Sequence, residues 1–194
     1  MKLHITGGQF KGLPLVVPRQ IRATEAKVRQ ALFNILGPSI EGARVLDGFA
    51  GSGALGLEAL SRGAAFVAFL EAAVDGVVAI RENLSRLEPE VPRSAWRIVH
   101  LDVERGFRQL AKAERPFDVI VLDPPYFSED GKKALNTVVE CAMLAAAGLV
   151  VLEHHQRTAV PASVGPLQQR TRHRYGDTVL SFYEAQAPVA SSPP

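Results

Sequence analysis

The apolar residues of the 194-residue chain follow two different patterns. In some segments most consecutive residues are apolar, as in the run 117–122, which is typical of buried parallel strands. In the segments between them apolar residues recur at every third or fourth position, which predicts helices with one buried face. The predicted strands cover residues 44–47, 66–70, 95–101, 117–122 and 149–153, and the predicted helices cover 54–62, 74–87, 103–113 and 132–146. This alternation predicts an α/β fold built on an open, mostly parallel, twisted sheet with helices on both faces.

Both ends of the chain depart from this alternation. Residues 3–5 and 13–17 predict a short N-terminal hairpin, and residues 25–36 predict a helix that Thr24 caps and Gly37 ends. The predicted apolar face of this helix consists of Val28, Leu32, Ile35 and Leu36. Near the carboxyl end, residues 167–174 and 178–184 flank a short turn and predict an antiparallel hairpin at one edge of the sheet.

These patterns divide the chain into three parts. Residues 1–38 form an N-terminal hairpin and helix extension, and residues 39–186 form the main α/β domain. Residues 187–194 contain mainly alanine, serine and proline without periodicity, and we expect them to be disordered.

Length and cysteine content narrow the class of protein. A chain of this length buries a core of its own without disulfides or metal ions. Its one cysteine, Cys141, is expected on a buried helix face, and no Cys/His cluster has the spacing of a metal site. No run of about 18 apolar residues predicts a membrane span, and the opening residues lack the pattern of a signal peptide. We therefore expect a cytoplasmic protein without metal, and a monomer is the simplest assembly.

Charge is unevenly distributed, although the net charge is only +2. The first thirty residues carry one acid, Glu25, and a group of basic residues: Lys2, Lys11, Arg19, Arg22, Lys27 and Arg29. Such a cluster is a candidate phosphate-binding surface, but charge alone favours this interpretation no more than an ordinary solvated face. Arg170, Arg172 and Arg174 alternate along a predicted strand and fit either a row of phosphate contacts or the charge that protects an edge strand.

A glycine-rich motif follows the first predicted strand of the main domain. Gly51, Gly53 and Gly56 have the spacing G-x-G-x-x-G and open a predicted helix. Glycines there permit a tight turn and a close approach of the backbone to a ligand. Glu71 follows about twenty residues later at the end of the next strand, where an acid binds ribose hydroxyls. Together these residues predict a site for a nucleotide-like cofactor.

Two aspartates indicate which cofactor the site takes. Asp47 directly precedes the glycine motif, and its negative charge would repel a pyrophosphate but suits the positively charged end of S-adenosylmethionine (SAM). Asp102 follows the third strand and is placed to accept a hydrogen bond from an adenine amine. The same residue is also in position to cap the helix that begins at Val103, and both roles are compatible.

The most specific motif is Asp123-Pro124-Pro125-Tyr126, which follows the fourth strand. An exocyclic amine of a nucleobase is a poor nucleophile because its lone pair is delocalised into the ring. The Asp123 carboxylate and the Pro124 carbonyl would accept its two hydrogens and free the lone pair. Tyr126 would stack against an extruded base, and Phe127 would extend that aromatic face.

The sequence resembles the RsmD family over nearly its whole length. The resemblance is carried by residues 7–12 (GGQFKG), 24–36 (TEAKVRQALFNIL) and 46–59 (LDGFAGSGALGLEA), together with the motif at 123–126. The family consists of Rossmann-like SAM-dependent methyltransferases that methylate the N2 amine of a guanine in bacterial 16S ribosomal RNA. Ala23 departs from the proline that is usual in the family, and Ala72-Ala73 after Glu71 replace more polar residues.

The resemblance implies a role for each part of the site. The cofactor site would consist of Asp47, Phe49, Gly51, Gly53, Glu71, Asp102 and Asp123. The catalytic corner would consist of Asp123, Pro124, Pro125 and Tyr126. The RNA contacts would include Lys11, Arg22, Thr24, Arg29 and Phe127. The implied partner is 16S ribosomal RNA, within a small ribosomal subunit or an assembly intermediate of it.

Other functions remain open from the sequence alone. Asn or Asp before Pro-Pro-Tyr also occurs in enzymes that methylate adenine N6 in DNA or glutamine in proteins. A non-catalytic RNA-binding factor on the same scaffold is a further alternative, although the retained Asp123 and the intact glycines disfavour it. A nicotinamide-dependent oxidoreductase is disfavoured by Asp47 beside the glycine motif.

Overall fold

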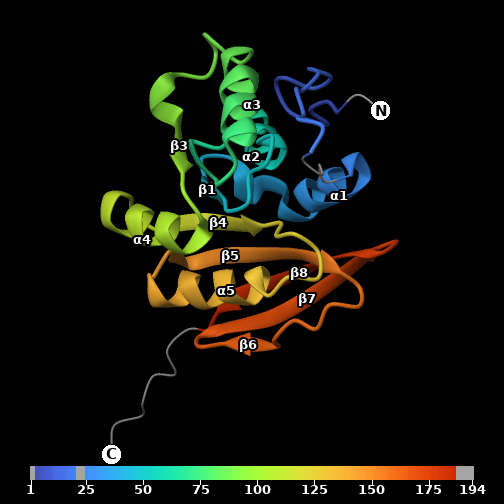
Figure 1. The fold of residues 1–194 in the computed structure, drawn as a ribbon, viewed down its shortest axis with the longest axis vertical. Helices are drawn as coiled ribbons and strands as arrows, with labels where there is room; N and C mark the ends of the chain where they lie inside the picture. Colours follow the sequence, from blue (N-terminus) through green and yellow to red (C-terminus); the bar gives the residue numbers. More distant parts are fainter. Residues whose placement is uncertain (1–2, 21–24, 187–194) are drawn as a thin grey trace, which may run out of the picture.

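The predicted α/β architecture is confirmed in a computed structural model that describes residues 3–20 and 25–186. Its eight-stranded sheet has the order β3-β2-β1-β4-β5-β8-β7-β6 (Figure 1). The strands are β1 (Arg44–Asp47), β2 (Phe66–Glu71), β3 (Trp96–His100), β4 (Phe117–Leu122), β5 (Leu144–His155), β6 (Ser163–Val164), β7 (Leu167–Tyr175) and β8 (Thr178–Ala185). Strands β1 to β5 pair in parallel, whereas β5, β8, β7 and β6 pair antiparallel, so the predicted C-terminal hairpin extends the sheet.

Helices cover both faces of the parallel part of the sheet. They are α1 (Ala26–Leu36), α2 (Ala54–Ser61), α3 (Val74–Ser85), α4 (Val103–Ala113) and α5 (Asp130–Glu140), with short 3-10 turns at Gly37–Ile40 and Arg93–Ala95. Alternate residues of a strand face opposite sides, so Val45 of β1 packs with α1 to α3, and its neighbour Leu46 packs with α4 and α5. The two apolar clusters therefore lie on opposite sides of one sheet.

The end of α5 differs from the prediction. The helix ends at Glu140 and β5 already begins at Leu144, although residues up to 146 were expected to be helical. Ala142 has a positive φ of 49°, and the N–H of Phe117 bonds to the carbonyl of Met143. Pairing with β4 thus overrides the helical propensity of this alanine-rich segment. Cys141 is consequently half-buried at the helix end and does not lie on a buried helix face.

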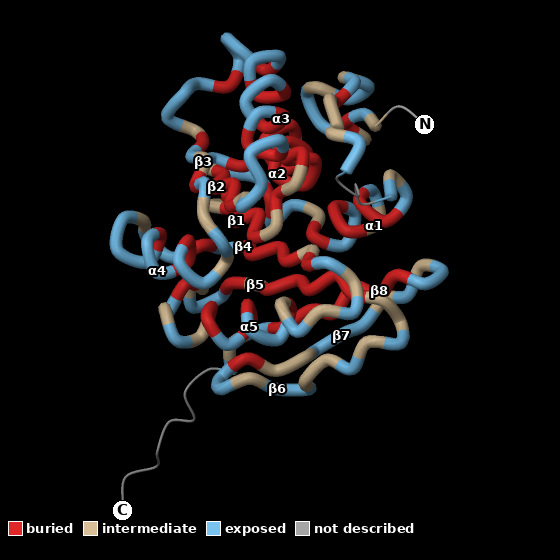
Figure 2. The backbone as a smooth tube through the Cα atoms, viewed as in Figure 1, coloured by how far each residue is buried: buried red, intermediate tan, exposed pale blue. Residues whose placement is uncertain are grey.

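The N-terminal hairpin is present in a reduced form. It consists of one isolated bridge between His4 and Pro14, with further backbone hydrogen bonds between residues 3–5 and 13–15. This segment packs against α2, whose residues are all buried, as Figure 2 shows. In α1 the residues Val28, Leu32 and Leu36 are buried as predicted, but Ile35 is 40% exposed because Phe33 occupies the inner face instead.

A buried carboxylate fixes the N-terminal segment to the main domain. Glu58 of α2 accepts hydrogen bonds from the N–H and the hydroxyl of Thr6, at 2.8 and 2.7 Å, and from Arg62 at 2.8 Å. It also pairs with Arg29 at 3.3 Å, and neither of these two side chains is exposed to solvent. Burial lowers the pKa of Arg29, and the charge of Glu58 opposes that shift. The expectation that Arg29 contacts RNA is therefore wrong, because its side chain is enclosed by protein.

Within the described residues, no helix has the length and apolar character needed to cross a membrane.

Candidate active site

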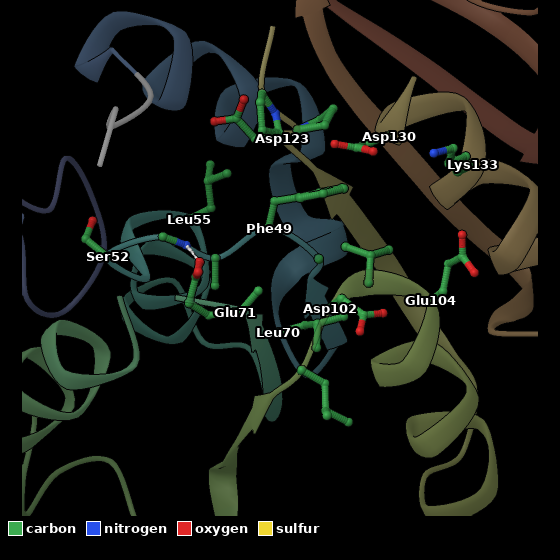
Figure 3. A pocket seen from close by; sticks show the side chains of 18 of the residues that line it. Phe49, Ser52, Leu55, Leu70, Glu71, Asp102, Glu104, Asp123, Asp130 and Lys133 are labelled. Atoms are coloured by element: carbon green, nitrogen blue, oxygen red, sulfur yellow. Dashed lines mark hydrogen bonds between the residues drawn. The ribbon is translucent and has the colours of Figure 1, made fainter. Parts of the chain in front are cut away.

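One large pocket opens at the carboxyl ends of the parallel strands. It has a volume of about 790 Å³ and lies where the strand order reverses between β1 and β4, as is usual for ligand sites in open α/β sheets. Figure 3 shows side chains from the β1, β2, β3 and β4 ends around the same hollow. Of the predicted site residues, the pocket brings together Phe49, Gly51, Glu71, Asp102, Asp123, Pro124, Pro125 and Tyr126.

The turn after β1 requires glycine for two physical reasons. Gly51 and Gly53 have φ values of 54° and 80°, a conformation that side chains disfavour. At Gly56 in α2 the limit is space, because a Cβ atom would lie 2.3 Å from the ring of Phe69. Gly48 has a similar limit, since a Cβ there would lie 2.6 Å from Leu122. The turn is therefore held close against β2 and β4.

Glu71 holds the glycine turn through its carboxylate. One oxygen accepts a hydrogen bond from the N–H of Gly51 at 2.6 Å (Figure 3). The other oxygen accepts one from the N–H of Ala73, also at 2.6 Å. The residue also lines the pocket, so the expected contact with a ribose remains a prediction that the position of the side chain permits. Gly76 of α3 lies directly behind this carboxylate, where an added Cβ would approach Glu71 to 2.7 Å and the carbonyl of Gly51 to 2.8 Å.

Asp47 is buried behind the pocket wall and does not form part of it. It is 1% exposed and is absent from the residues that line the pocket. Its Oδ2 accepts a hydrogen bond from the N–H of Gly56 at 2.9 Å, whereas its buried Oδ1 has no hydrogen-bond partner among the described residues. Burial raises the pKa of Asp47 to about 7, the N–H of Gly56 opposes the rise, and the charges of Asp123 and Glu71 add to it. A positive charge bound in front of this carboxylate would favour its ionised form.

Asp102 combines the two roles that the sequence left open. Its side chain accepts a hydrogen bond from the N–H of Arg105 at 3.0 Å and therefore caps α4. It lines the pocket as well and is about half exposed. One carboxylate can serve both purposes because each oxygen accepts more than one hydrogen bond.

The Asp-Pro-Pro-Tyr corner forms the opposite wall of the pocket. All four residues line it, directly after β4. The hydroxyl of Tyr126 bonds to Thr178 of β8 at 2.7 Å and to the buried Glu153 of β5 at 3.3 Å. The antiparallel strands thus orient the aromatic ring from behind the pocket.

Sequence patterns did not identify several residues of the pocket wall. Gln20 reaches it from the N-terminal segment, Glu104 from α4, and Asp130 and Lys133 from the first turn of α5. These residues belong to no recognisable motif. The spacing of three between Asp130 and Lys133 was the one available signal, since it places two charges on one helix face.

The remaining RNA candidates divide into three groups. Lys11 is exposed, and Phe127 is 72% exposed at the outer rim of the corner. Arg29 is buried, as described above. Arg22 and Thr24 lie outside the described residues.

No group of His, Cys, Asp or Glu side chains that could hold a metal ion occurs in the part of the chain that the structure describes.

The parallel sheet, the glycine turn with its two acids and the Asp-Pro-Pro-Tyr corner on a shared pocket define a Rossmann-like methyltransferase. The chain belongs to the family described as Conserved hypothetical protein 95, whose sequence profile matches residues 3–184. This finding and the relatives below confirm the resemblance to the RsmD family.

Two curated relatives and two solved structures illustrate the similarity. Ribosomal RNA small subunit methyltransferase D of Escherichia coli K12 is 32% identical over 190 residues, which cover 96% of this chain and 91% of that protein. Bacillus subtilis YlbH is 36% identical over 184 residues, 94% of this chain and 98% of that protein. The structure of Escherichia coli YhhF has a TM-score of 0.82 and 29% identity, and it covers 96% of this chain and 99% of that one. SMU.776, described as complexed with SAH, shares the fold with a TM-score of 0.63 at 18% identity over 81% of this chain and 48% of that one.

Proposed function

We propose that the protein is a SAM-dependent methyltransferase that modifies the exocyclic N2 amine of a guanine in small-subunit ribosomal RNA. One observation carries the proposal: the glycine turn and the Asp123 corner line the same pocket. A donor held at the turn and an amine held at the corner would therefore meet within one enclosed space. Catalysis would depend mainly on positioning and on hydrogen bonds to the amine.

The residues of the pocket fit SAM. Its volume of about 790 Å³ is in the usual range for small-molecule and cofactor sites. Behind the pocket wall, the buried Oδ1 of Asp47 has no hydrogen-bond partner among the described residues and suits a ligand that brings positive charge. On the wall itself, Glu71 and Asp102 offer acceptors for a ribose and an adenine amine. Phe49 adds an apolar surface. When bound, the cofactor supplies an electrophilic methyl group, and the protein itself needs no nucleophile.

The corner after β4 supports the choice of an amine as methyl acceptor. The Asp123 carboxylate and the Pro124 carbonyl would accept the two amine hydrogens, and consecutive prolines present no competing N–H. Tyr126, fixed by Thr178 and Glu153, would stack on the base. The amine becomes acidic once it is methylated, so its proton can leave without a strong base in the site.

The choice of RNA as substrate rests on the relatives. The Escherichia coli relative is named for the small-subunit ribosomal RNA, and the alignment with it spans nearly the whole of both chains. We therefore propose 16S ribosomal RNA as the partner, in a preassembled small subunit or assembly intermediate, and a monomeric enzyme in the cytoplasm.

A transfer assay with a tritium-labelled donor tests this function. Purified protein is incubated with small ribosomal subunits, free 16S ribosomal RNA, duplex DNA and a protein extract, and the labelled nucleosides or amino acids are identified. We expect N2-methylguanine from ribosomal RNA, with the stronger signal from assembled particles. Label in N6-methyladenine of DNA or in glutamine would replace this proposal with one of its alternatives. RNA binding without transfer would indicate a non-catalytic factor.

A further inference from the structure

An aromatic pair lies beside the catalytic pocket but outside its wall. The rings of Phe127 and His155 have centroids 4.8 Å apart and planes inclined at 46°. Tyr126 contacts both rings edge-on, at 6.3 and 5.6 Å between centroids. Neither Phe127 nor His155 lines the large pocket, and both line a smaller hollow that shares Pro124, Pro125 and Tyr126 with it. The pair therefore continues the aromatic surface of the corner outward.

The backbone at Phe127 is held in an unfavourable conformation. Its φ is 62°, which is uncommon for a residue other than glycine, asparagine or aspartate. The following turn is closed by Ser128, whose N–H and hydroxyl both bond to the carbonyl of Pro125, at 3.4 and 2.9 Å. Despite this arrangement the side chain gains little burial, because 72% of it is exposed. Burial within the chain thus offsets little of the cost of this backbone conformation.

His155 is held in place at the end of β5. Its Nδ1 accepts a hydrogen bond from the N–H of Arg157 at 3.1 Å, so in the neutral ring the proton is on Nε2. Gln156 is fixed by a bond from its N–H to the carbonyl of Asp177, at 2.7 Å. The backbone of the turn that follows β5 therefore orients the ring.

The charges around the pair are mixed, with cations available for phosphates. Arg157, two residues after His155, is exposed, and the exposed Lys132 lines the smaller hollow. The exposed Glu129 lines it as well, so the surface is not uniformly basic. Flat rings combined with separated cations suit a single-stranded nucleotide, whose base stacks while its phosphate meets a cation.

We propose that Phe127 and His155 form a stacking site for the base of a nucleotide adjacent to the modified one. This inference rests on the proposed function, since it assumes that the target base enters the neighbouring pocket. Extruding a base leaves the gap beside its neighbour open, and an external aromatic surface next to the pocket would replace the lost stacking. The occupant is therefore an unpaired base of the same RNA.

The test measures stacking without requiring methyl transfer. Single-stranded RNA oligonucleotides contain one guanine with the fluorescent base 2-aminopurine on its 5′ or its 3′ side. Binding is followed by anisotropy and stacking by quenching of the 2-aminopurine emission. We expect one of the two positions to be quenched by the wild-type protein, and Phe127→Ala to weaken binding about tenfold and to remove the quenching.

Further variants separate a flat ring from mere apolar contact and from backbone strain. Phe127→Trp is expected to bind like the wild type, whereas Phe127→Leu is not. Phe127→Gly accommodates the positive φ, so its binding is expected to fall like that of Phe127→Ala even if the fold becomes more stable. His155→Phe is expected to retain quenching, and His155→Ala to reduce it. Val78→Ala, at an exposed apolar residue of α3, is the matched control.

The outcomes distinguish this inference from the proposed function. Full quenching with Phe127→Ala, or wild-type binding by Phe127→Leu, would overturn the stacking site even in an active enzyme. Absence of RNA binding by the wild-type protein would overturn it as well. Loss of quenching in Phe127→Ala together with no transfer to any RNA would retain the stacking site and reject the proposed function.

Discussion

The glycine turn after β1 and the diproline corner after β4 lie at the ends of adjacent strands, yet they are built in different ways. At the turn, carboxylates of the chain accept hydrogen bonds from backbone N–H groups, as in the bonds of Glu71 to Gly51 and Ala73 and of Asp47 to Gly56. At the corner, Tyr126 is fixed from behind while Phe127 extends into solvent. The turn is thus shaped before a ligand arrives, whereas the corner ends in an aromatic ring that is open to a partner.

The difference matches the two ligands that we propose. The cofactor is the same small molecule in every reaction, so one rigid conformation of the glycine turn can serve every binding event. A turn that is already rigid loses little conformational entropy when the cofactor binds. A ribosomal RNA target is large and must be opened at one nucleotide, so the residues that meet it need to be accessible. The experiments that follow test this contrast between a preformed turn and an open corner.

The largest effect is expected from Asp123→Ala at the corner. We expect methyl transfer to fall by about 10²- to 10³-fold, the usual cost of removing one group that stabilises the reacting centre. Cofactor affinity, measured by calorimetry, should persist because the turn is left intact. Asp130→Ala, another acid of the pocket wall, is the control and should retain most activity. An equal loss of cofactor binding and methyl transfer in Asp123→Ala would contradict the assignment of cofactor binding to the turn and of amine binding to the corner.

Adding a methyl group behind the glycine turn should weaken cofactor binding and leave RNA binding unchanged. Gly76→Ala places a Cβ 2.7 Å from Glu71 and 2.8 Å from the Gly51 carbonyl, so the turn must shift. Overpacking of this kind costs about 1–3 kcal/mol, and we expect the KM for the cofactor to rise about tenfold with the KM for RNA unchanged. Val78→Ala on the same helix serves as control. A rise in the RNA KM alone would contradict the assignment.

Acid should weaken cofactor binding through Asp47. Its pKa in the free protein is raised to about 7, and a bound cation would lower it, so binding releases a proton. Affinity should therefore fall by up to tenfold per pH unit below about pH 7 and stay level above it. Asp47→Asn should bind more weakly than the wild type at pH 8 and without this pH dependence. A pH dependence that survives in Asp47→Asn would assign the proton to another group.

The same shift has a consequence for folding stability. Because the folded protein binds this proton more tightly than the unfolded chain, whose carboxyl has the ordinary value of 3.8, the contribution of Asp47 to stability decreases as the pH rises from about 4 to about 7. In the absence of cofactor, Asp47→Asn should flatten the pH dependence of the thermal midpoint in that range.

The smallest effect is expected where the corner is fixed from behind. Tyr126→Phe keeps the ring but removes its hydroxyl bonds to Thr178 and Glu153. Losing one such anchor costs about 0.5–1.5 kcal/mol, and we expect kcat to fall a few-fold, whereas Tyr126→Ala should lose much more because stacking is lost as well. Equal effects of the two variants would show that the hydroxyl, and not the ring, carries the role of Tyr126.

Local patterns were sufficient for most of the fold. The strand 117–122 and the helix 103–113 have the predicted bounds, because continuous apolar runs and helical spacing are properties of a few adjacent residues. The prediction was wrong at residues 144–146, where pairing with β4 overrides helical propensity, and at Ile35, where Phe33 takes the inner position. Both errors lie where a distant segment decides the outcome.

The same distinction separates what the sequence determined about the site from what only the tertiary structure decided. The glycine turn and the residues 123–126 were readable because each is a compact motif that directly follows a strand. The prediction for Arg29 was wrong because its partner, Glu58, is 29 positions away in the sequence, and the pair is buried only in the folded chain. Asn83 has no recognisable sequence signal for the same reason. It is buried, its amide donates to the carbonyls of Val16 and Ser52, and it thereby joins the N-terminal segment to the glycine turn. A charge or an amide in a sequence has no fixed meaning, because the free energy of burying it depends on whether folding brings a partner within hydrogen-bond distance.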